Sequence, residues 1–272
     1  MILLQNCSNA NGFNSIFLYQ CSSEDILKII KDFEIDKASD ISVRVLKRIA
    51  NYISEHLSSF INYFMQCGIF PKLLKIGKIT PIFKKDDAQL FDNYRPISVL
   101  PIFGKIFEKI LYDRLYNFFT SKSVINSKQF GFRKYHSTGH AINYSINKIV
   151  NELQKRNHVI GLFIDLSKAF DTIDHEKLLV KLEYYGIRGI CLELIKSYLC
   201  NRQQCTEFNG TNSDFCSIKY GVPQGSVLGT LLFLMYINDL IKNNRSDGDT
   251  NNNDNCDEFV LFADDTNCIY CR

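Results

Sequence analysis

The chain has 272 residues, 46% of them hydrophobic and 22% charged, and carries a formal net charge of +3. This balance is that of a globular protein with a core, and the mild positive charge permits nucleic-acid binding without arguing for it. The longest apolar stretch, Leu231 to Ile237, is far too short to cross a bilayer, so no membrane association is expected. The ten cysteines have no repeating spacing, which favours reduced thiols in an intracellular protein over a disulfide framework.

The N-terminal part contains two predicted helices. Residues 1–21 show no hydrophobic period and are expected to form a loose leader. Ser22 then opens a short helix with a cap-like hydroxyl and acidic residues at its positive end. A longer helix is predicted from about Ser39 to Phe64, where apolar residues recur at helical spacing, and Gly68 ends it.

The segment from Lys72 to Phe91 changes character. Its isoleucines surround Pro81 in a pattern typical of extended chain. It also holds the densest basic run of the sequence, formed by Lys72, Lys75, Lys78, Lys84 and Lys85. For an isolated run, a solvated lysine face is the simplest interpretation. A helix is predicted from Phe103 to Phe118, a loop from Ser127 to Gly139, and another helix from Ala141 to Leu153.

One strand and two helices are predicted in the middle of the chain. The continuous apolar run from His158 to Asp165, which ends in one acid, is the pattern of a buried strand. Asp174 is expected to cap a helix that runs to Tyr185, and a second helix spans about Ile190 to Leu199.

A hairpin, a turn and an apolar helix follow. Asn209-Gly210 predicts a hairpin between Arg202–Phe208 and Phe215–Tyr220. A Gly-rich turn, Gly221–Ser226, precedes a helix from Val227 to Ile241. Residues 243–255 are rich in Asn and Asp and are expected to form a mobile loop.

Two adjacent carboxylates, Asp264 and Asp265, lie between the short apolar runs 259–262 and 268–270. Such runs predict two strands, so the acids fall at the turn of a hairpin. Two carboxylates at one turn repel each other and lose solvation unless a cation is bound, and a divalent ion with oxygen ligands fits best. An acidic surface turn that binds nothing is the simpler alternative.

Asp165 extends this hypothesis. If its strand and the Asp264-Asp265 hairpin share one sheet, three carboxylates converge at one edge. Such a cluster binds two divalent ions roughly 4 Å apart and suits phosphoryl transfer, which depends on positioning and charge neutralisation. The basic run with Arg95 would then hold a triphosphate. Spacing alone does not establish the convergence, and an isolated Asp165 is more often a strand-end cap or a salt-bridge partner.

Several short blocks of the sequence carry a family resemblance. They are Lys84–Asp87 with Asn93–Leu100, Gln129–Arg133 with Ser137-Thr138, Phe163–Asp171, Gly221–Leu228, and Phe262–Asp265. In this order they resemble the reverse transcriptase domain of a non-LTR (LINE-type) retrotransposon. An ordered series of matches is far more specific than any single one. The resemblance runs from about Leu73 to the last residue, and it departs from the family at Thr230, where Pro is usual.

The resemblance implies a metal site. Asp165 and Asp264 would ligate two Mg²⁺ ions, with the backbone carbonyl of Leu166 assisting and Mn²⁺ as an alternative ion. Asp265 would complete the acidic cluster, so that all three aspartates are catalytic.

The resemblance also implies a triphosphate site. Arg95 would hold the triphosphate, because its planar guanidinium bonds phosphate oxygens in pairs, with Lys84 or Lys85 beside it. Arg133 would touch the template or brace the fingers, and a loop salt bridge is nearly as good an interpretation.

The remaining nucleotide contacts come from two other blocks. Phe170 would press on the sugar and exclude a 2′-hydroxyl, although a core phenylalanine is also consistent with its position. Gln224 and Gly225 would line the nucleotide pocket, where glycine lets the backbone approach closely.

The fold implied by the resemblance is α+β, a right-hand polymerase fingers–palm fold with an antiparallel palm sheet packed on helices. Residues 1–35 would form the N-terminal leader and short helix, residues 36–157 the fingers region, and residues 158–272 the palm. The thumb and the later palm blocks are expected to be missing, since only residues 266–272 follow Asp265.

The implied activity is RNA-directed DNA synthesis. Its partners would be an RNA template, a DNA primer and deoxynucleoside triphosphates, with thumb and endonuclease segments outside this chain; the family makes the nucleus a plausible location. One alternative is a catalytically inactive remnant that at most binds nucleic acid. Another is a related polymerase, such as a group II intron-type reverse transcriptase or a viral RNA polymerase, although Phe170 argues against ribonucleotide use. A structural protein with an acidic turn would need no metal.

Overall fold

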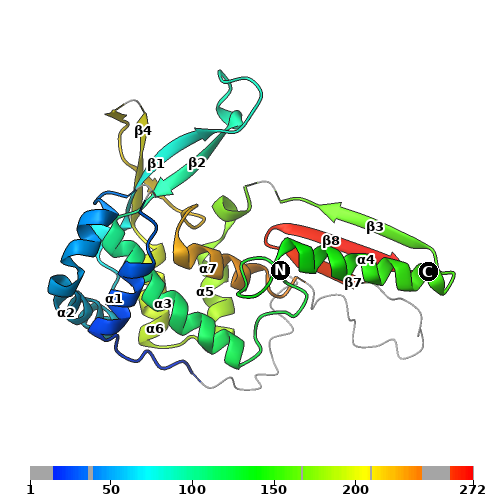
Figure 1. Cartoon of the computed structure of the whole chain (residues 1–272), viewed down its shortest axis with the longest axis horizontal. Helices are drawn as coiled ribbons and strands as arrows, with labels where there is room; N and C mark the ends of the chain where they lie inside the picture. Colours follow the sequence, from blue (N-terminus) through cyan, green and yellow to red (C-terminus); the bar gives the residue numbers. More distant parts are fainter. Residues whose placement is uncertain (1–14, 36–38, 167, 209, 241–257, 272) are drawn as a thin grey trace. The chain divides into compact units, whose positions relative to one another are not determined.

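The computed structural model of the chain describes residues 15–35, 39–166, 168–208, 210–240 and 258–271, which form an α+β structure. These residues belong to two compact units, each built from two separate segments (Figure 1). The first unit comprises Met1–Lys122 and Phe170–Leu232, and the second comprises Ser123–Ala169 and Phe233–Arg272. These units do not test the division into leader (1–35), fingers (36–157) and palm (158–272), which stays a prediction.

Helices form most of the core of the first unit. α1 (Ser23–Asp32) contacts α2 (Val43–Cys67) and α3 (Ile102–Ser121), while α6 (Ile190–Leu199) contacts α2 and α5 (His175–Tyr184). Each helix buries apolar residues at helical spacing, which is why the sequence pattern found them. The ends follow the expected chemistry: the Ser22 hydroxyl accepts from the Asp25 N–H, and Gly68 ends α2 with φ of +67°.

The sheet of the first unit joins segments that are far apart in the sequence. β1 (Ile76–Phe83) pairs antiparallel with β2 (Tyr94–Val99) and parallel with β4 (Arg202–Phe208), and Figure 1 shows the three side by side. β4 also pairs with the short strands β5 (Thr211–Asn212) and β6 (Cys216–Ile218). Short 3-10 helices, η1 (Lys72–Lys75) and η2 (Phe91–Asn93), precede β1 and β2, and η3 (Ala169–Thr172) precedes α5.

The sheet of the second unit is antiparallel in its described strands. Its order is β3 (Val159–Ile164), β8 (Asp265–Cys271), β7 (Glu258–Phe262). α4 (Thr138–Gln154) packs on this sheet (Figure 1), where its residue Ala141 joins a core with Val260, Ile269 and Cys271. The expected antiparallel sheet packed on a helix, with the hairpin acids at its turn, is therefore present.

α7 (Val227–Ile237) begins in the first unit and ends in the second. It is shorter than the predicted helix, which extended to residue 241, because Asn238–Leu240 already form a turn. The loop predicted at 243–255 lies outside the described residues. In the described part of the chain, no helix combines the length and apolarity needed to cross a membrane.

The prediction of a buried strand at 158–165 was wrong in one respect. The strand exists, but most of its side chains are exposed, with Ile160 at 64% and Phe163 at 76% of full exposure. Within the described residues, β3 is an edge strand that pairs only with β8, and the core under α4 is formed by buried residues of β7 and β8. An apolar run shows that a strand could be buried, but it does not show that another element covers the strand.

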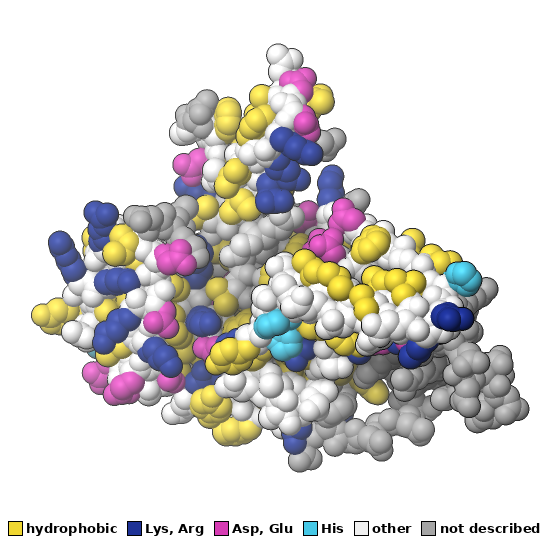
Figure 2. Space-filling model, turned by 45° about the vertical axis from the view of Figure 1, so that its right-hand side comes forward, with side chains coloured by type: hydrophobic (Ala, Val, Ile, Leu, Met, Phe, Trp, Pro, Cys, Tyr) yellow, Lys and Arg dark blue, Asp and Glu magenta, His cyan; other side chains and the backbone are white. Residues whose placement is uncertain are grey.

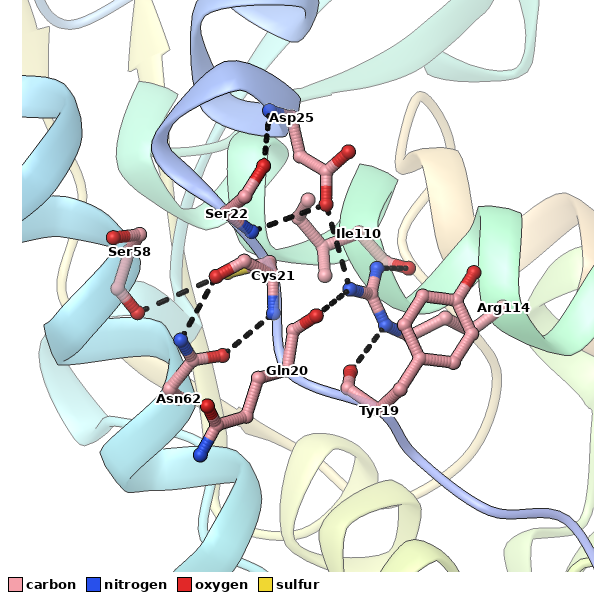
Figure 3. Close-up of polar contacts among 9 residues, drawn as sticks. All are labelled: Tyr19, Gln20, Cys21, Ser22, Asp25, Ser58, Asn62, Ile110 and Arg114. Atoms are coloured by element: carbon pink, nitrogen blue, oxygen red, sulfur yellow. Dashed lines mark hydrogen bonds and ion pairs between the residues drawn. The ribbon is translucent and has the colours of Figure 1, made fainter.

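Residues 15–22, the described part of the segment before α1, contain no helix or strand, and their last residues are held by two helices (Figure 3). Asn62 of α2 accepts from the Cys21 N–H at 2.8 Å and donates to the Cys21 carbonyl at 2.9 Å. Arg114 of α3 donates to the carbonyls of Tyr19 and Gln20, and its guanidinium lies 4.3 Å from the centre of the Tyr19 ring. These contacts fix the entry to α1.

Glu152 ties the end of α4 to the start of β3. Its carboxylate accepts hydrogen bonds from Lys155 at 2.9 Å and Asn157 at 2.8 Å, and Lys148 lies 3.4 Å away. These hydrogen bonds, that of Lys155 first, lower the pKa of Glu152 from 4.5 to about 2. The ionised form therefore stabilises the fold, and this contribution is present above pH 4.5 and lost as the pH falls toward 2.

Replacing Glu152→Gln should lower the melting temperature at neutral pH, and the difference from the wild type should shrink as the pH falls from 4.5 to 2. Thermal unfolding followed by circular dichroism across this range measures it. Glu183→Gln, a change at an exposed glutamate of α5, serves as the control. A Glu152→Gln difference that is the same at every pH would contradict the assigned role.

Candidate active site

Strand pairing in the second unit brings the predicted acids to one end of the sheet. β3 and β8 pair in a register that sets Ile164 opposite Thr266, so one further step places Asp165 across from Asp265. Asp264 is the second residue of the tight turn between β7 and β8, since Phe262 pairs with Asp265. The condition stated for convergence, one shared sheet, is thus met for all three. Leu166 follows Asp165 directly and is 38% exposed.

The charges of the three acids act on one another. Partial desolvation raises the pKa of Asp265, and the negative charges of Asp264 and Asp165 raise it further. Among the described residues, no three His, Cys, Asp or Glu side chains are already arranged around a common metal position. The donor chemistry nevertheless fits a hard divalent cation, which prefers carboxylate oxygens. The strands β3, β7 and β8 contain no Lys or Arg that could neutralise the three carboxylates instead.

A second group of predicted residues lies on the β1–β2 hairpin of the first unit. Ile82 pairs with Arg95, and the Lys84 N–H donates to the Asn93 carbonyl at 2.9 Å, so the hairpin closes directly beside the basic residues. A hollow of about 510 Å³ there is lined by Ile82, Phe83, Lys84, Lys85, Arg95 and Ile97. Figure 2 shows Lys and Arg side chains gathered on this part of the first unit.

The rest of the basic run does not share this position. Lys75 is only 5% exposed and donates to the Ser197 hydroxyl and the Cys200 carbonyl, so it is a structural residue. Burial lowers the pKa of Lys75. Lys78 forms an ion pair with Glu207 at 3.0 Å. The expectation that the whole run from Lys72 to Lys85 forms a clamp was therefore wrong for the buried Lys75. The spacing in the sequence could not reveal the partners of Lys75 and Lys78 on or next to α6 and β4.

The Gly-rich turn joins Phe170 to β2. The Val222 N–H donates to the Phe170 carbonyl at 2.9 Å. Gln224 accepts from the Ser98 N–H through its backbone carbonyl at 3.0 Å and donates from its side chain to Asp171 at 3.2 Å. Gly225 has φ of +100°, and a Cβ there would lie 3.2 Å from the Ser98 carbonyl oxygen. The first unit therefore places Phe170, Gln224 and Gly225 on connected backbone that also contacts the strand of Arg95.

Glu108 fixes the helix that follows this turn, a role that the sequence did not reveal. Its buried carboxylate accepts from the Val227 N–H at 2.8 Å and the Leu228 N–H at 3.4 Å, at the start of α7, and from the Tyr198 hydroxyl at 3.0 Å. Burial raises the pKa of Glu108, an effect that the positive charge of Arg202 opposes. A carboxylate at a helix N-terminus satisfies free N–H groups, so Glu108 sets where the turn ends.

Arg133 braces its own loop. Its Nη1 donates to the carbonyls of Asn126 at 3.1 Å and Gln129 at 2.9 Å. Of the interpretations left open by the sequence, these contacts favour bracing, in the second unit, through backbone carbonyls.

Gly131 lies against the turn that carries Asp264. The sequence placed Gly131 in a family block but did not reveal this contact. A Cβ at Gly131 would lie 2.8 Å from the Cα of Ala263 and from the Phe262 carbonyl carbon, closer than real Cβ contacts. Only glycine lets the 129–133 segment approach the turn so closely.

Comparison with known proteins assigns a family to this arrangement. Residues 82–272 match the model of the family described as reverse transcriptase (RNA-dependent DNA polymerase). The chain is 30% identical over 230 residues to the RNA-directed DNA polymerase from mobile element jockey of Drosophila melanogaster, covering 83% of this chain and 25% of that protein. It is also 30% identical over 227 residues to the probable RNA-directed DNA polymerase from transposon BS of the same species, covering 80% of this chain and 24% of that protein. The chain thus spans about a quarter of the length of these relatives.

Gly131→Ala should destabilise the second unit by about 1–3 kcal/mol, the usual cost of overpacking, because the added methyl meets backbone that cannot rotate away. Chemical denaturation measures the change. Gly139→Ala, in the first turn of α4, is the matched control: its methyl would meet only the Ser137 hydroxyl at 3.6 Å, and alanine favours the helix. Equal stability of the two variants would refute the close contact at Gly131.

Proposed function

The chain belongs to the reverse transcriptase (RNA-dependent DNA polymerase) family, and on that premise we propose that it is the catalytic part of a longer non-LTR retrotransposon protein. Its reaction is the RNA-templated attack of a primer 3′-hydroxyl on the α-phosphate of a deoxynucleoside triphosphate, with release of pyrophosphate. The observation that carries the proposal is the β3–β8 pairing, which brings Asp165 and Asp265 to the end of the sheet where Asp264 forms the turn.

The acids have one role in this proposal. Asp165, Asp264 and Asp265, with the Leu166 carbonyl, would hold divalent cations, either Mg²⁺ or Mn²⁺. When bound, such ions activate the attacking hydroxyl and neutralise the charge on the leaving pyrophosphate. Partial desolvation raises the pKa of Asp265 first, and the negative charges of Asp264 and Asp165 raise it further; a bound cation would offset those charges.

The first unit would bind the nucleotide. Lys84, Lys85 and Arg95 line one hollow and are all exposed, as charges that receive a triphosphate must be. The guanidinium of Arg95 bonds phosphate oxygens in pairs, whereas each lysine supplies a point charge. These contacts orient the reacting phosphate, and positioning is a large part of catalysis in phosphoryl transfer.

Three further residues would define the base and sugar positions. Gln224 and Gly225 would lie against the nucleotide, since Gly225 is exposed and its missing Cβ lets the turn approach Ser98 closely. Phe170, whose carbonyl is held by the Val222 N–H, would contact the sugar and exclude a 2′-hydroxyl. The hydrogen bond fixes the Phe170 backbone and so limits how far its ring can retreat.

Asp165→Asn should abolish both metal binding and synthesis. Mn²⁺ binding is measured by electron paramagnetic resonance, and nucleotide incorporation by primer extension on an RNA template. Incorporation should fall by more than about 100-fold, since losing a direct ligand costs more than the 10–100-fold typical of an outer-shell partner. Asp214→Asn, at an exposed acid of the first unit, should leave both measurements unchanged. Metal binding without incorporation by the wild type would favour the inactive remnant instead.

Phe170→Ala should relax sugar selection. Because a pocket rejects an added hydroxyl mainly by shape, incorporation of ribonucleotides relative to deoxynucleotides should rise by up to on the order of 100-fold. The ratio is measured by single-nucleotide extension with each substrate. Phe208→Ala, at an exposed phenylalanine of β4, is the control. An unchanged ratio in Phe170→Ala would remove this residue from the sugar site, and equal use of both substrates by the wild type would indicate a different class of polymerase.

A further inference from the structure

The turn that carries Asp264 has an unusual backbone. Ala263 and Asp264 are the two residues between β7 and β8, and Ala263 has φ of +58°. A positive φ at the first position is required by the tight turns that fit hairpins, and glycine usually supplies it. An alanine there is strained unless the surroundings hold it. The structure must therefore contain groups that hold the backbone of Ala263 in this conformation.

Gln129 supplies those groups from outside the hairpin. Its Oε1 accepts from the Ala263 N–H at 3.0 Å and from the Gly131 N–H at 2.7 Å, while its Nε2 donates to the Ala263 carbonyl at 3.4 Å. The side chain is almost fully buried, at 2% exposure. One primary amide thus binds both the N–H and the carbonyl of Ala263, which a side chain without both a donor and an acceptor cannot do.

Gln129 is itself held in register with the hairpin. The Phe130 N–H donates to the Leu261 carbonyl at 2.8 Å, and the Leu261 N–H donates to the Lys128 carbonyl at 2.9 Å, which forms a parallel bridge between Gln129 and Leu261. On the other side, Arg133 donates to the Gln129 carbonyl at 2.9 Å. The amide is therefore presented to the turn by a braced backbone.

We propose that Gln129 is a positioning residue that holds Asp264 and Asp265 ready for divalent cations by fixing the backbone N–H and carbonyl of Ala263. The inference rests on the proposed metal-binding role of these acids. Three like charges at one sheet end push the turn to open when no cation is present, and a turn that opens must be reordered at each binding event. Because the Ala263 carbonyl is bonded directly to the Asp264 nitrogen, fixing it also fixes the backbone position of Asp264. The carboxylate ligands then stay in place, and the entropy cost of ordering the turn when a cation binds is avoided.

The test compares two buried amides of the second unit. Gln129→Met removes the clamp with little change of volume, and Gln129→Asn keeps an amide that is one methylene too short to reach both groups of Ala263. The control is Asn238→Leu: Asn238 is 3% exposed, accepts from the Asn126 N–H and donates to the Val124 carbonyl, each at 2.8 Å. It holds the start of the loop that leads to Gln129, where the Gln129 N–H donates to the Asn126 carbonyl, but no hydrogen bond joins Asn238 to Ala263. The control therefore tests whether loosening this loop is enough to weaken binding.

Mn²⁺ is the probe, titrated into the full chain and followed by electron paramagnetic resonance, with thermal stability measured alongside. Both Gln129 variants should bind Mn²⁺ roughly 10-fold more weakly, the lower end of what an outer-shell partner costs. Asn238→Leu should lose comparable stability but keep the wild-type affinity. Hydrogen exchange in the peptide that covers 261–266 should speed up in the Gln129 variants and not in Asn238→Leu.

Two results would overturn the inference while leaving the metal site intact. One is wild-type Mn²⁺ affinity in the Gln129 variants, and the other is an equal loss of affinity in Asn238→Leu, which would show a general effect of instability. If the wild type binds Mn²⁺ no better than Asp264→Asn does, the proposed function itself fails, and the positioning role fails with it.

Discussion

The antiparallel pairing of β3 with β8 is the constraint on which the candidate site depends. Asp165 lies about a hundred residues before Asp265 in the chain, and only this register brings them to the same sheet end. A shift of one residue would turn one of the two carboxylates to the opposite face. The core of Ala141, Val260, Ile269 and Cys271 stabilises the register, because Ile269 and Cys271 are buried on the face that meets α4. Apolar packing on one face of the sheet thus determines where the carboxylates of Asp165, Asp264 and Asp265 lie at the end of the sheet.

In the first unit, a buried carboxyl group sets the position of the turn. Glu108 accepts three hydrogen bonds, two of them from the start of α7, so that helix begins at a fixed place. The turn before it then has little freedom, and its backbone bonds to Phe170 and Ser98 follow from that. Removing one partner of such a buried network is costly, because the remaining groups stay desolvated and unpaired. Glu108, which lies outside the proposed nucleotide site, therefore helps to decide where Gln224 and Gly225 lie.

Sequence patterns predicted the local structure well and the long-range contacts poorly. α6 was predicted at its observed bounds, and the capping Ser22 was identified, because periodicity and capping act within a few residues. The acids and the basic hairpin residues were recognised from family blocks. The parallel β1–β4 pair, the burial of Lys75 and the roles of Glu108 and Gln129 were not, since each depends on a partner more than a hundred residues away. The exposure of β3 could not be predicted either, because it depends on which distant elements pack against the faces of the strand.

That exposed strand has a practical consequence for work with the isolated chain. Among the described residues no strand pairs with the outer edge of β3, which offers backbone N–H and carbonyl groups together with exposed Ile160, Leu162 and Phe163. Strands of this kind recruit strands from other molecules and so promote aggregation. A lysine placed at Leu162 would protect the edge by charge repulsion between copies. Leu162 lies in the strand that leads to Asp165, so the substitution could also change the proposed metal site. Purification yield and metal affinity would therefore be measured on the same preparation.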